Sequence, residues 1–274
     1  MGSVGADVSQ EPITVLITGF APFKKGYPVN PSWEIARSLP EWLPPVRAKT
    51  TTGPGSEPAS TPVVIPPVRL LVHPAPIQVS YATVRALVPK LWNLDNTDTE
   101  PDPGPDDDDP SMSKRRRPDL VIHIGMAGPR LFYSIERRGH RDGYVMRDVD
   151  GALLGDEERR AREGEQWVWH GVPRELETEV DVEDVLGRWR GLSPKYMDLR
   201  ISEDAGHYLC DFIYFSSLAH LYKAGQKRKV LFLHVPSDAS EHSIALGREL
   251  VLQLVRSVVE SEVARQGKGK EEAG

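Results

Sequence analysis

The stretch Ile13-Thr-Val-Leu-Ile-Thr18, closed by Gly19, decides the fold class of this chain. Its residues are apolar or β-branched without interruption, which is typical of a strand buried on both faces. Similar runs return at 119–125 and 229–235, and a glycine or a proline closes each of them. Strands of this kind form parallel sheets whose two faces are covered by helices. The three runs therefore predict the centre of such a sheet.

Helical segments alternate with these runs. Asn30-Pro31 predicts a helix start, because asparagine is a favoured N-cap and proline is tolerated at the first helical position. Apolar residues at helical spacing predict further helices from Ser80 to about Trp92, from between Ser202 and Gly206 to Gly225, and from about Ser240 to Glu262. Shorter strands are expected at 68–73, 131–136 and 198–202. The alternation predicts an α/β fold of three α/β/α layers with a twisted, mostly parallel central sheet.

The domain organisation follows from composition. We expect a disordered leader at 1–11, a single domain at 12–264 and a disordered tail at 265–274. Flexible insertions are expected at about 44–68, which is rich in Pro, Thr, Ser and Gly, and at about 93–117, which carries an acidic and a basic block.

Net charge and hydropathy indicate which macromolecules the protein does not bind and in which compartment it is found. A net charge of −6 argues against non-specific nucleic-acid binding. The sequence contains no apolar run long enough to span a bilayer and no signal-peptide pattern at its start. Together with the single unpaired cysteine, this predicts a reducing compartment, the cytoplasm. The oligomeric state is not predicted.

Cys210 is the only cysteine, which excludes an internal disulfide and any multi-cysteine metal site. Two interpretations follow. The residue is either a small, inert packing residue or a reactive thiol nucleophile.

The positions of two other residues favour the reactive thiol. In open α/β sheets, ligands bind beyond the carboxyl ends of the strands. Glu136 closes one expected strand, His234 lies near the end of another, and Cys210 follows a third. A thiolate acts as nucleophile, a histidine lowers its pKa and protonates the leaving group, and a carboxylate fixes the histidine tautomer. A helix start close to Cys210 also favours the thiolate.

Each of these residues also has an ordinary structural interpretation. Glu136 could pair with Arg137 or Arg138 in solvent, His234 could be satisfied by backbone groups, and Cys210 could belong to the core.

Four segments together resemble pyroglutamyl peptidase I, the cysteine peptidase family that removes amino-terminal pyroglutamate. They are Val15-Leu-Ile-Thr-Gly-Phe-Ala-Pro-Phe23 with Asn30-Pro-Ser-Trp33; Pro118-Asp-Leu-Val-Ile-His-Ile-Gly-Met-Ala-Gly128 with Ile135-Glu-Arg-Arg-Gly-His140; Ser202-Glu-Asp-Ala-Gly-His-Tyr-Leu-Cys210; and Phe232-Leu-His-Val-Pro236. They occur in the family's order. The resemblance implies a cytosolic omega-peptidase without metal or cofactor, with Glu136, Cys210 and His234 as the catalytic triad.

The resemblance also implies substrate-binding residues. Phe20 and Phe23 match positions that wall the pyroglutamate pocket, and Asn30 matches an asparagine of the same motif. Each has a second interpretation: Phe20 and Phe23 as core residues, and Asn30 as a helix N-cap. The expected partner is a peptide with amino-terminal pyroglutamate.

Two features depart from the family pattern. Lys24-Lys25 follows Phe23 where many relatives carry glycines, and Arg141 stands where relatives often carry an asparagine near the site. Two alternative functions therefore stay open: a related cysteine hydrolase with another small amide substrate, and a non-catalytic scaffold of the same fold.

Overall fold

The structure is a computed structural model that describes residues 11–23, 25–45, 64–92, 117–128 and 130–271. Most of the expected leader, residues 46–63 and 93–116 of the two expected insertions and the last three residues lie outside the described residues, as do Lys24 and Pro129.

The described elements alternate along the chain, as the sequence predicts. In order they are β1 (Ile13–Gly19), α1 (Pro31–Arg37), β2 (Val68–Val72), α2 (Tyr81–Trp92), β3 (Leu120–Met126), β4 (Tyr133–Glu136), β5 (Arg138–His140), α3 (Asp156–Glu163), the 3-10 helix η2 (Gly164–Gln166), β6 (Glu175–Glu177), α4 (Val182–Leu192), β7 (Leu199–Ser202), α5 (Leu209–Lys223), β8 (Val230–Val235) and α6 (Glu241–Glu271).

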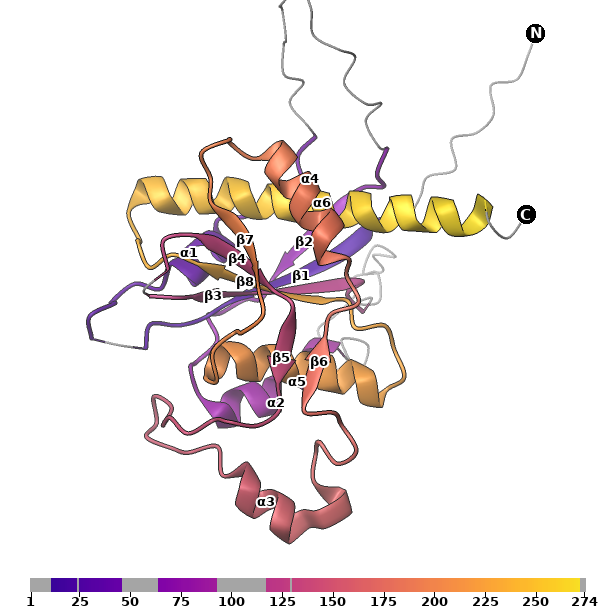
Figure 1. The fold of residues 1–274 in the computed structure, drawn as a ribbon. Coiled ribbons are helices and arrows are strands. Elements are labelled where there is room, and N and C mark those ends of the chain that lie inside the picture. Colours follow the sequence, from indigo (N-terminus) through magenta and orange to yellow (C-terminus); the bar gives the residue numbers. More distant parts are fainter. Residues whose placement is uncertain (1–10, 24, 46–63, 93–116, 129, 272–274) are drawn as a thin grey trace, which may run out of the picture.

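The central sheet has the strand order β2-β1-β3-β8-β4-β7. β2, β1, β3 and β8 run parallel to one another, whereas β4 runs antiparallel to β8 and parallel to β7. Helices cover both faces, which confirms the predicted three-layer architecture with a mostly parallel sheet (Figure 1). β5 and β6 form a separate antiparallel pair beside α5.

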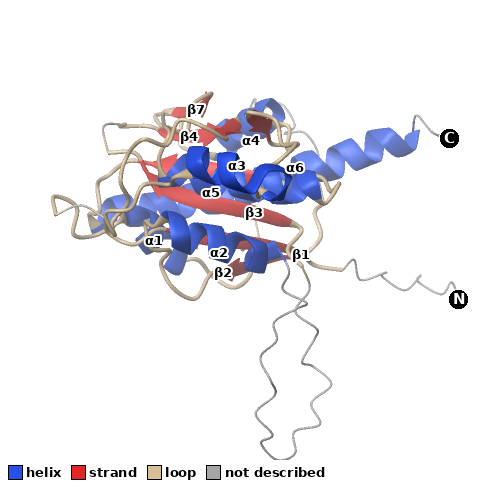
Figure 2. Cartoon of the chain, turned by 90° about the horizontal axis from the view of Figure 1, so that it is seen from below, coloured by secondary structure: helices blue, strands red, loops and turns tan. Residues whose placement is uncertain are grey.

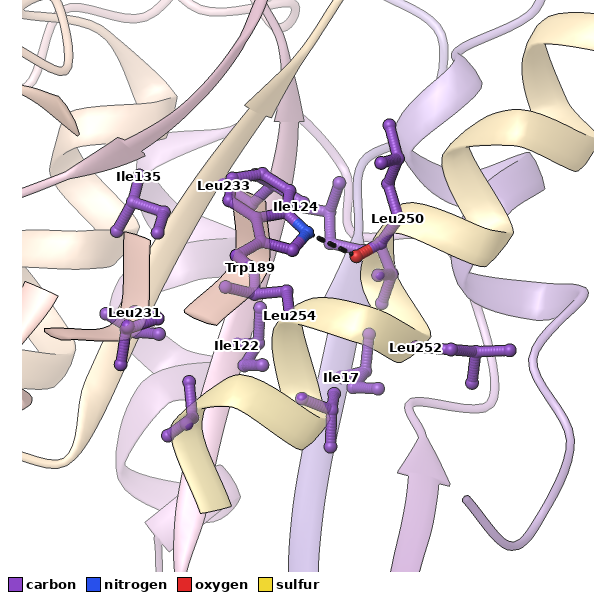
Figure 3. Packing of buried hydrophobic residues seen from close by; sticks show 14 of the residues in the cluster. Ile17, Ile122, Ile124, Ile135, Trp189, Leu231, Leu233, Leu250, Leu252 and Leu254 are labelled. Carbon is purple, nitrogen blue, oxygen red and sulfur yellow. Dashed lines mark hydrogen bonds between the residues drawn. The ribbon is translucent and has the colours of Figure 1, made fainter. Parts of the chain in front are cut away.

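Two hydrophobic clusters hold the layers together. One joins α1, α4 and α6 to the sheet, and the other packs α2 and α5 against its opposite face (Figures 1 and 2). In the first cluster the fully buried indole of Trp189 on α4 donates a 2.9 Å hydrogen bond to the carbonyl of Leu250 on α6 (Figure 3). This bond satisfies the one polar atom that the buried indole carries.

A polar chain crosses the buried interior. Thr18 Oγ1 lies 2.8 Å from Nδ1 of His123, and His123 Nε2 lies 2.8 Å from Oγ of Ser217. These three side chains are completely buried and connect β1, β3 and α5. Burial lowers the pKa of His123 to about 3, with a smaller contribution from His73, so the ring is neutral in the folded protein.

The structure corrects several expected boundaries. α5 begins at Leu209 rather than between Ser202 and Gly206. α6 continues to Glu271, so residues 265–271 of the expected disordered tail are helical. In the polar segment 137–192 the sequence predicts only a short helix near 180–190, which is α4, and the structure adds β5, α3, η2 and β6. None of the helices in the described part of the chain has the length and apolar character needed to cross a membrane.

Candidate active site

Glu136 and His234 meet across the antiparallel pair β4–β8. In the register of this pair Ser134 lies opposite His234, and Glu136 lies opposite Phe232. Because side chains alternate between faces, Glu136 and His234 are diagonal neighbours on one face. Oε1 of Glu136 lies 2.7 Å from Nδ1 of His234, and both side chains are buried.

The expectation that Glu136 reaches the site from the carboxyl rim of a parallel strand is wrong. β4 runs against β8, so Glu136 approaches His234 from the opposite direction. The two side chains still meet because β4 is short and its last residue reaches only the middle of β8.

The surroundings of Glu136 favour its ionised form. Burial raises its pKa, but hydrogen bonding to His234, the charge of His234, Ser202 and the Arg130 guanidinium together outweigh burial, so the pKa of Glu136 is lowered. A carboxylate on Nδ1 holds the Nδ1–H tautomer and leaves Nε2 of His234 as the basic nitrogen.

Cys210 is the second residue of α5, so it lies at the positive end of the helix dipole, as the sequence predicts. A Cβ added to Gly125 would lie only 2.8 Å from Cys210 Sγ, and Gly125 is the register partner of His234 on β8. The thiol therefore lies above the strand pair that carries His234. Among the described residues no hydrogen bond joins the thiol to His234.

The protonation state of Cys210 differs from the expected thiolate. Burial above all, and then the charges of Glu136 and Asp211, raise the pKa of the Cys210 thiol to about 12, while the charge of Arg130 opposes them. The thiol is therefore protonated at neutral pH, although the residue as a whole is only half-buried. A reaction at this sulfur needs a base that removes the proton during attack.

Arg130 is a site residue that the sequence analysis missed. Its Nη1 donates to Glu136 Oε1 at 2.6 Å and to Ser134 Oγ at 2.8 Å, and lies 3.4 Å from His234 Nδ1. Its Nη2 donates to the carbonyl of Asp204, in the segment that leads to Cys210. A signal was present, since Arg130 closely follows the glycine-ended strand at the predicted binding rim.

The three predicted substrate-binding residues occupy different positions. Phe23 is half-buried, and its ring centroid lies 6.3 Å from that of Tyr208, which precedes α5. Phe20 is buried in the hydrophobic cluster of α2 and α5. Asn30 caps α1, so the helix N-cap interpretation is confirmed.

The side chain of Asn30 is occupied by local contacts. Its Oδ1 accepts from the backbone N–H and the hydroxyl of Ser32, and its Nδ2 donates to the carbonyl of Ala21. Asn30 thus ties the start of α1 to the loop that leads to Phe23.

Arg141 points away from the triad. Its Nη1 donates to the carbonyl of Val172 at 2.6 Å, and its guanidinium lies 5.6 Å from the ring centroid of Trp167. The family-pattern departure at this position therefore makes no direct contact with Glu136 or His234.

A cavity of about 470 Å³ lies at the other end of the parallel strands, between the amino ends of β1 and β3 and helix α6. Ile13, Leu120 and Val258 are among its lining residues, and none of the triad lines it. It lies away from the rim at which ligands of open α/β sheets bind.

The fold and the site together define an α/β protein with a thiol, an imidazole and a carboxylate gathered beside the strand β8. That is the arrangement of a cysteine hydrolase. Comparison with known proteins shows which kind of cysteine hydrolase the chain is similar to. The family model for pyroglutamyl peptidase matches residues 111–245.

Relatives and solved structures agree with the family model. The chain is 27% identical to human pyroglutamyl-peptidase 1 over 93% of each chain. It is 27% identical to the pyrrolidone-carboxylate peptidase of Thermococcus onnurineus, over 81% of this chain and 82% of that protein. The solved pyrrolidone carboxyl peptidase of Thermococcus litoralis has the same fold, with a TM-score of 0.61 at 17% identity over 92% of this chain and 96% of that one. The chain is thus similar to pyroglutamyl peptidases over most of its length.

Proposed function

We propose that this protein is a cysteine-type omega-peptidase that hydrolyses the amide bond after an amino-terminal pyroglutamyl residue. Similarity to pyroglutamyl peptidases over most of the chain supports the reaction. The observation that carries the proposal is the 2.7 Å contact between Glu136 and His234 beside the thiol at the start of α5.

The proposed mechanism starts from a neutral thiol. Cys210 Sγ attacks the pyroglutamyl carbonyl carbon while His234 Nε2 takes the thiol proton, so no stable thiolate is needed beforehand. Glu136 stabilises the imidazolium that forms. The imidazolium then protonates the departing amine, and the C–N bond breaks.

Water completes the cycle. His234 removes a proton from a water molecule that attacks the thioester, and pyroglutamate leaves as Cys210 regains its proton. The first backbone N–H groups of α5, including that of Cys210, have no partner within the helix and are suited to stabilise the oxyanion.

The aromatic surroundings of Cys210 fit the substrate. Pyroglutamate is a small, flat, uncharged lactam, which calls for apolar walls and a few hydrogen-bond partners. We propose that Phe23 forms one wall together with Tyr208, and that Phe20 supports this wall from the core. We assign Asn30 the role of holding the loop that carries Phe23.

The proposal also covers the organisation and location of the protein. One peptidase domain begins near residue 12 and extends through α6 to Glu271, beyond the expected boundary at 264. A reducing compartment such as the cytoplasm suits a mechanism that depends on one free thiol. The proposed partner is a peptide substrate, not nucleic acid or membrane.

The test is release of a fluorophore from a pyroglutamyl amide. The native chain should turn it over and Cys210→Ala should not. Ser216→Ala is the matched control, because it also removes one heteroatom from α5 and its buried hydroxyl has no hydrogen-bond partner. Equal loss in both variants would contradict the nucleophile assignment.

A substrate panel separates the alternatives. Prolyl and glutaminyl amides lack the lactam, and hydrolysis of either in preference to the pyroglutamyl amide would favour the related hydrolase with another substrate. No turnover of any amide by the folded, reduced chain would favour the non-catalytic scaffold.

A further inference from the structure

His140, His207 and Asp211 form a cluster outside the catalytic contacts. His140 ends β5, His207 precedes α5, and Asp211 follows Cys210 in the first turn of α5. One ligand-type atom from each of the three lies within 4.8 Å of the other two. The sequence gives no sign of this cluster, because His140 lies far along the chain from His207 and Asp211.

The spacing of the cluster fits a metal ion. Asp211 Oδ2 lies 3.1 Å from Nδ1 of His140 and 3.6 Å from Nδ1 of His207. In a tetrahedral zinc site with ligand bonds of about 2.0–2.2 Å, neighbouring ligand atoms lie about 3.3–3.6 Å apart. The two distances from Asp211 Oδ2 to the histidine nitrogens are therefore already close to those of a tetrahedral zinc site.

The ligand set is held by surrounding contacts. The backbone N–H of His140 donates to Asp211 Oδ1 at 2.9 Å, which leaves Oδ2 facing the two rings. Gly143, at φ +97°, allows close approach of His207, since a Cβ there would lie 2.9 Å from its Nδ1. The carbonyl of Asp142, 3.1 Å from the same Nδ1, offers a further oxygen. Fixed outer contacts of this kind are typical of metal sites.

The donor atoms of the cluster are those that a zinc-class ion prefers. Asp211 is completely buried, and its Oδ2 lies close to one ring nitrogen of each histidine. Imidazole nitrogens and carboxylate oxygens are common ligands of such ions.

We propose that His140, His207 and Asp211 form a binding site for a transition-metal ion of the zinc class. The ion would join the end of β5 to the first turn of α5, one residue from Cys210. Binding would therefore raise the melting temperature, because the ion binds the folded chain and not the separated segments.

The test uses Co²⁺ as a spectroscopic probe and is carried out in the Cys210→Ser chain, so that the thiol cannot supply the ligand. We expect one Co²⁺ per chain with the visible absorption of a tetrahedral site, displaced by Zn²⁺. His207→Gln, at a partly exposed side chain, should weaken binding by about 10-fold or more. His170→Gln, an exposed histidine elsewhere, is the control and should change nothing.

Two results would overturn the proposal. One is unchanged Co²⁺ affinity in His207→Gln. The other is metal binding in the native chain that disappears in Cys210→Ser, which would place the ion on the catalytic thiol. Because neither readout uses turnover, failure of the metal site is distinguishable from failure of the proposed peptidase function.

Discussion

At the scale of single residues, one carboxylate oxygen of Glu136 accepts hydrogen bonds from both His234 and Arg130. His234 Nδ1 and Arg130 Nη1 both lie on Oε1, at 2.7 Å and 2.6 Å. The histidine contact orients the base, while the arginine contact helps to keep the buried carboxylate ionised. We therefore propose that Arg130 is a positioning residue, which acts on the reaction through Glu136.

Replacing Arg130 should shift the pH dependence of activity. The folded pKa of Glu136 is lowered, so its ionised form is present above that pKa and is lost as the pH falls through it. Arg130→Gln removes one cause of the lowering, and the acid limb of kcat/KM should move to higher pH. We also expect a fall in kcat of about 10-fold or more, because the oriented carboxylate loses a fixed neighbour.

The control for this prediction is Arg200→Gln. Arg200 stacks on Phe132, as Arg130 also does at longer range, but pairs with Asp198 in solvent. An unchanged acid limb in Arg130→Gln, or the same shift in both variants, would contradict the assigned role.

Gly125 matters because it has no side chain, which leaves room for the Phe232 ring and the Cys210 sulfur. A Cβ there would lie 2.5 Å from the Phe232 ring and 2.8 Å from Cys210 Sγ. Gly125→Ala should displace the thiol, lower kcat by about 100-fold and cost about 1–3 kcal/mol of unfolding free energy. Steady-state kinetics and urea unfolding would measure both effects.

Gly187→Ala is the matched glycine control, since a Cβ there meets nothing within 4 Å in the middle of α4. This substitution should raise the free energy of unfolding by about 0.5–1 kcal/mol, because alanine favours the helix more than glycine does. Normal turnover by Gly125→Ala would show that the sulfur does not need its present position.

At the scale of elements, the start of α1 at the Asn30 cap was predictable from sequence, and the contribution of this cap to stability can be measured. The Asn30 side chain accepts from Ser32 N at 3.1 Å. Asn30→Ala should cost about 1 kcal/mol, and Asn30→Ser should recover most of that loss because serine also caps helices. Urea unfolding of the three chains would decide this, and equal stabilities would contradict the capping role.

Strand identities were predictable from sequence, whereas strand directions were not. The runs at 13–19, 120–126 and 230–235 are almost entirely apolar, so burial alone identifies them. The direction of β4 depends on its pairing with β8, and that of β7 on its pairing with β4, and local sequence carries no signal of either pairing. Chain order and chemistry nevertheless pointed to Glu136 and His234, whose side chains lie in contact, and the catalytic roles of the triad stay a prediction. Arg130 and the His140–His207 pairing required the folded geometry.

At the scale of the whole molecule, the buried His123 should make stability depend on pH. Its folded pKa of about 3 lies below the ordinary value of 6.5, so the unfolded chain binds a proton in the window between them and the folded chain does not. The corresponding stability is present above pH 6.5 and is lost as the pH falls toward 3.

The loss from this one residue should be about 2 kcal/mol between about pH 7 and about pH 5. His123→Gln removes the titrating group, so the difference in unfolding free energy between the two pH values should shrink by that amount. Urea titrations of both chains measure it. An unchanged pH dependence would show that His123 does not titrate in this way.

The strand order also bears on how the chain is made. β8 lies between β3 and β4, so it alone joins the β2-β1-β3 half of the sheet to the β4-β7 half, and it is the last strand to be synthesised. Until it emerges from the ribosome, the growing polypeptide holds two half-sheets with open edges, which are templates for aggregation. A chain stopped before Val230 should therefore be degraded or captured by chaperones. Glu136 lies on β4 and His234 on β8, so their contact forms only when β8 pairs with β4. Peptidase activity should therefore appear only after this last strand pairing has formed.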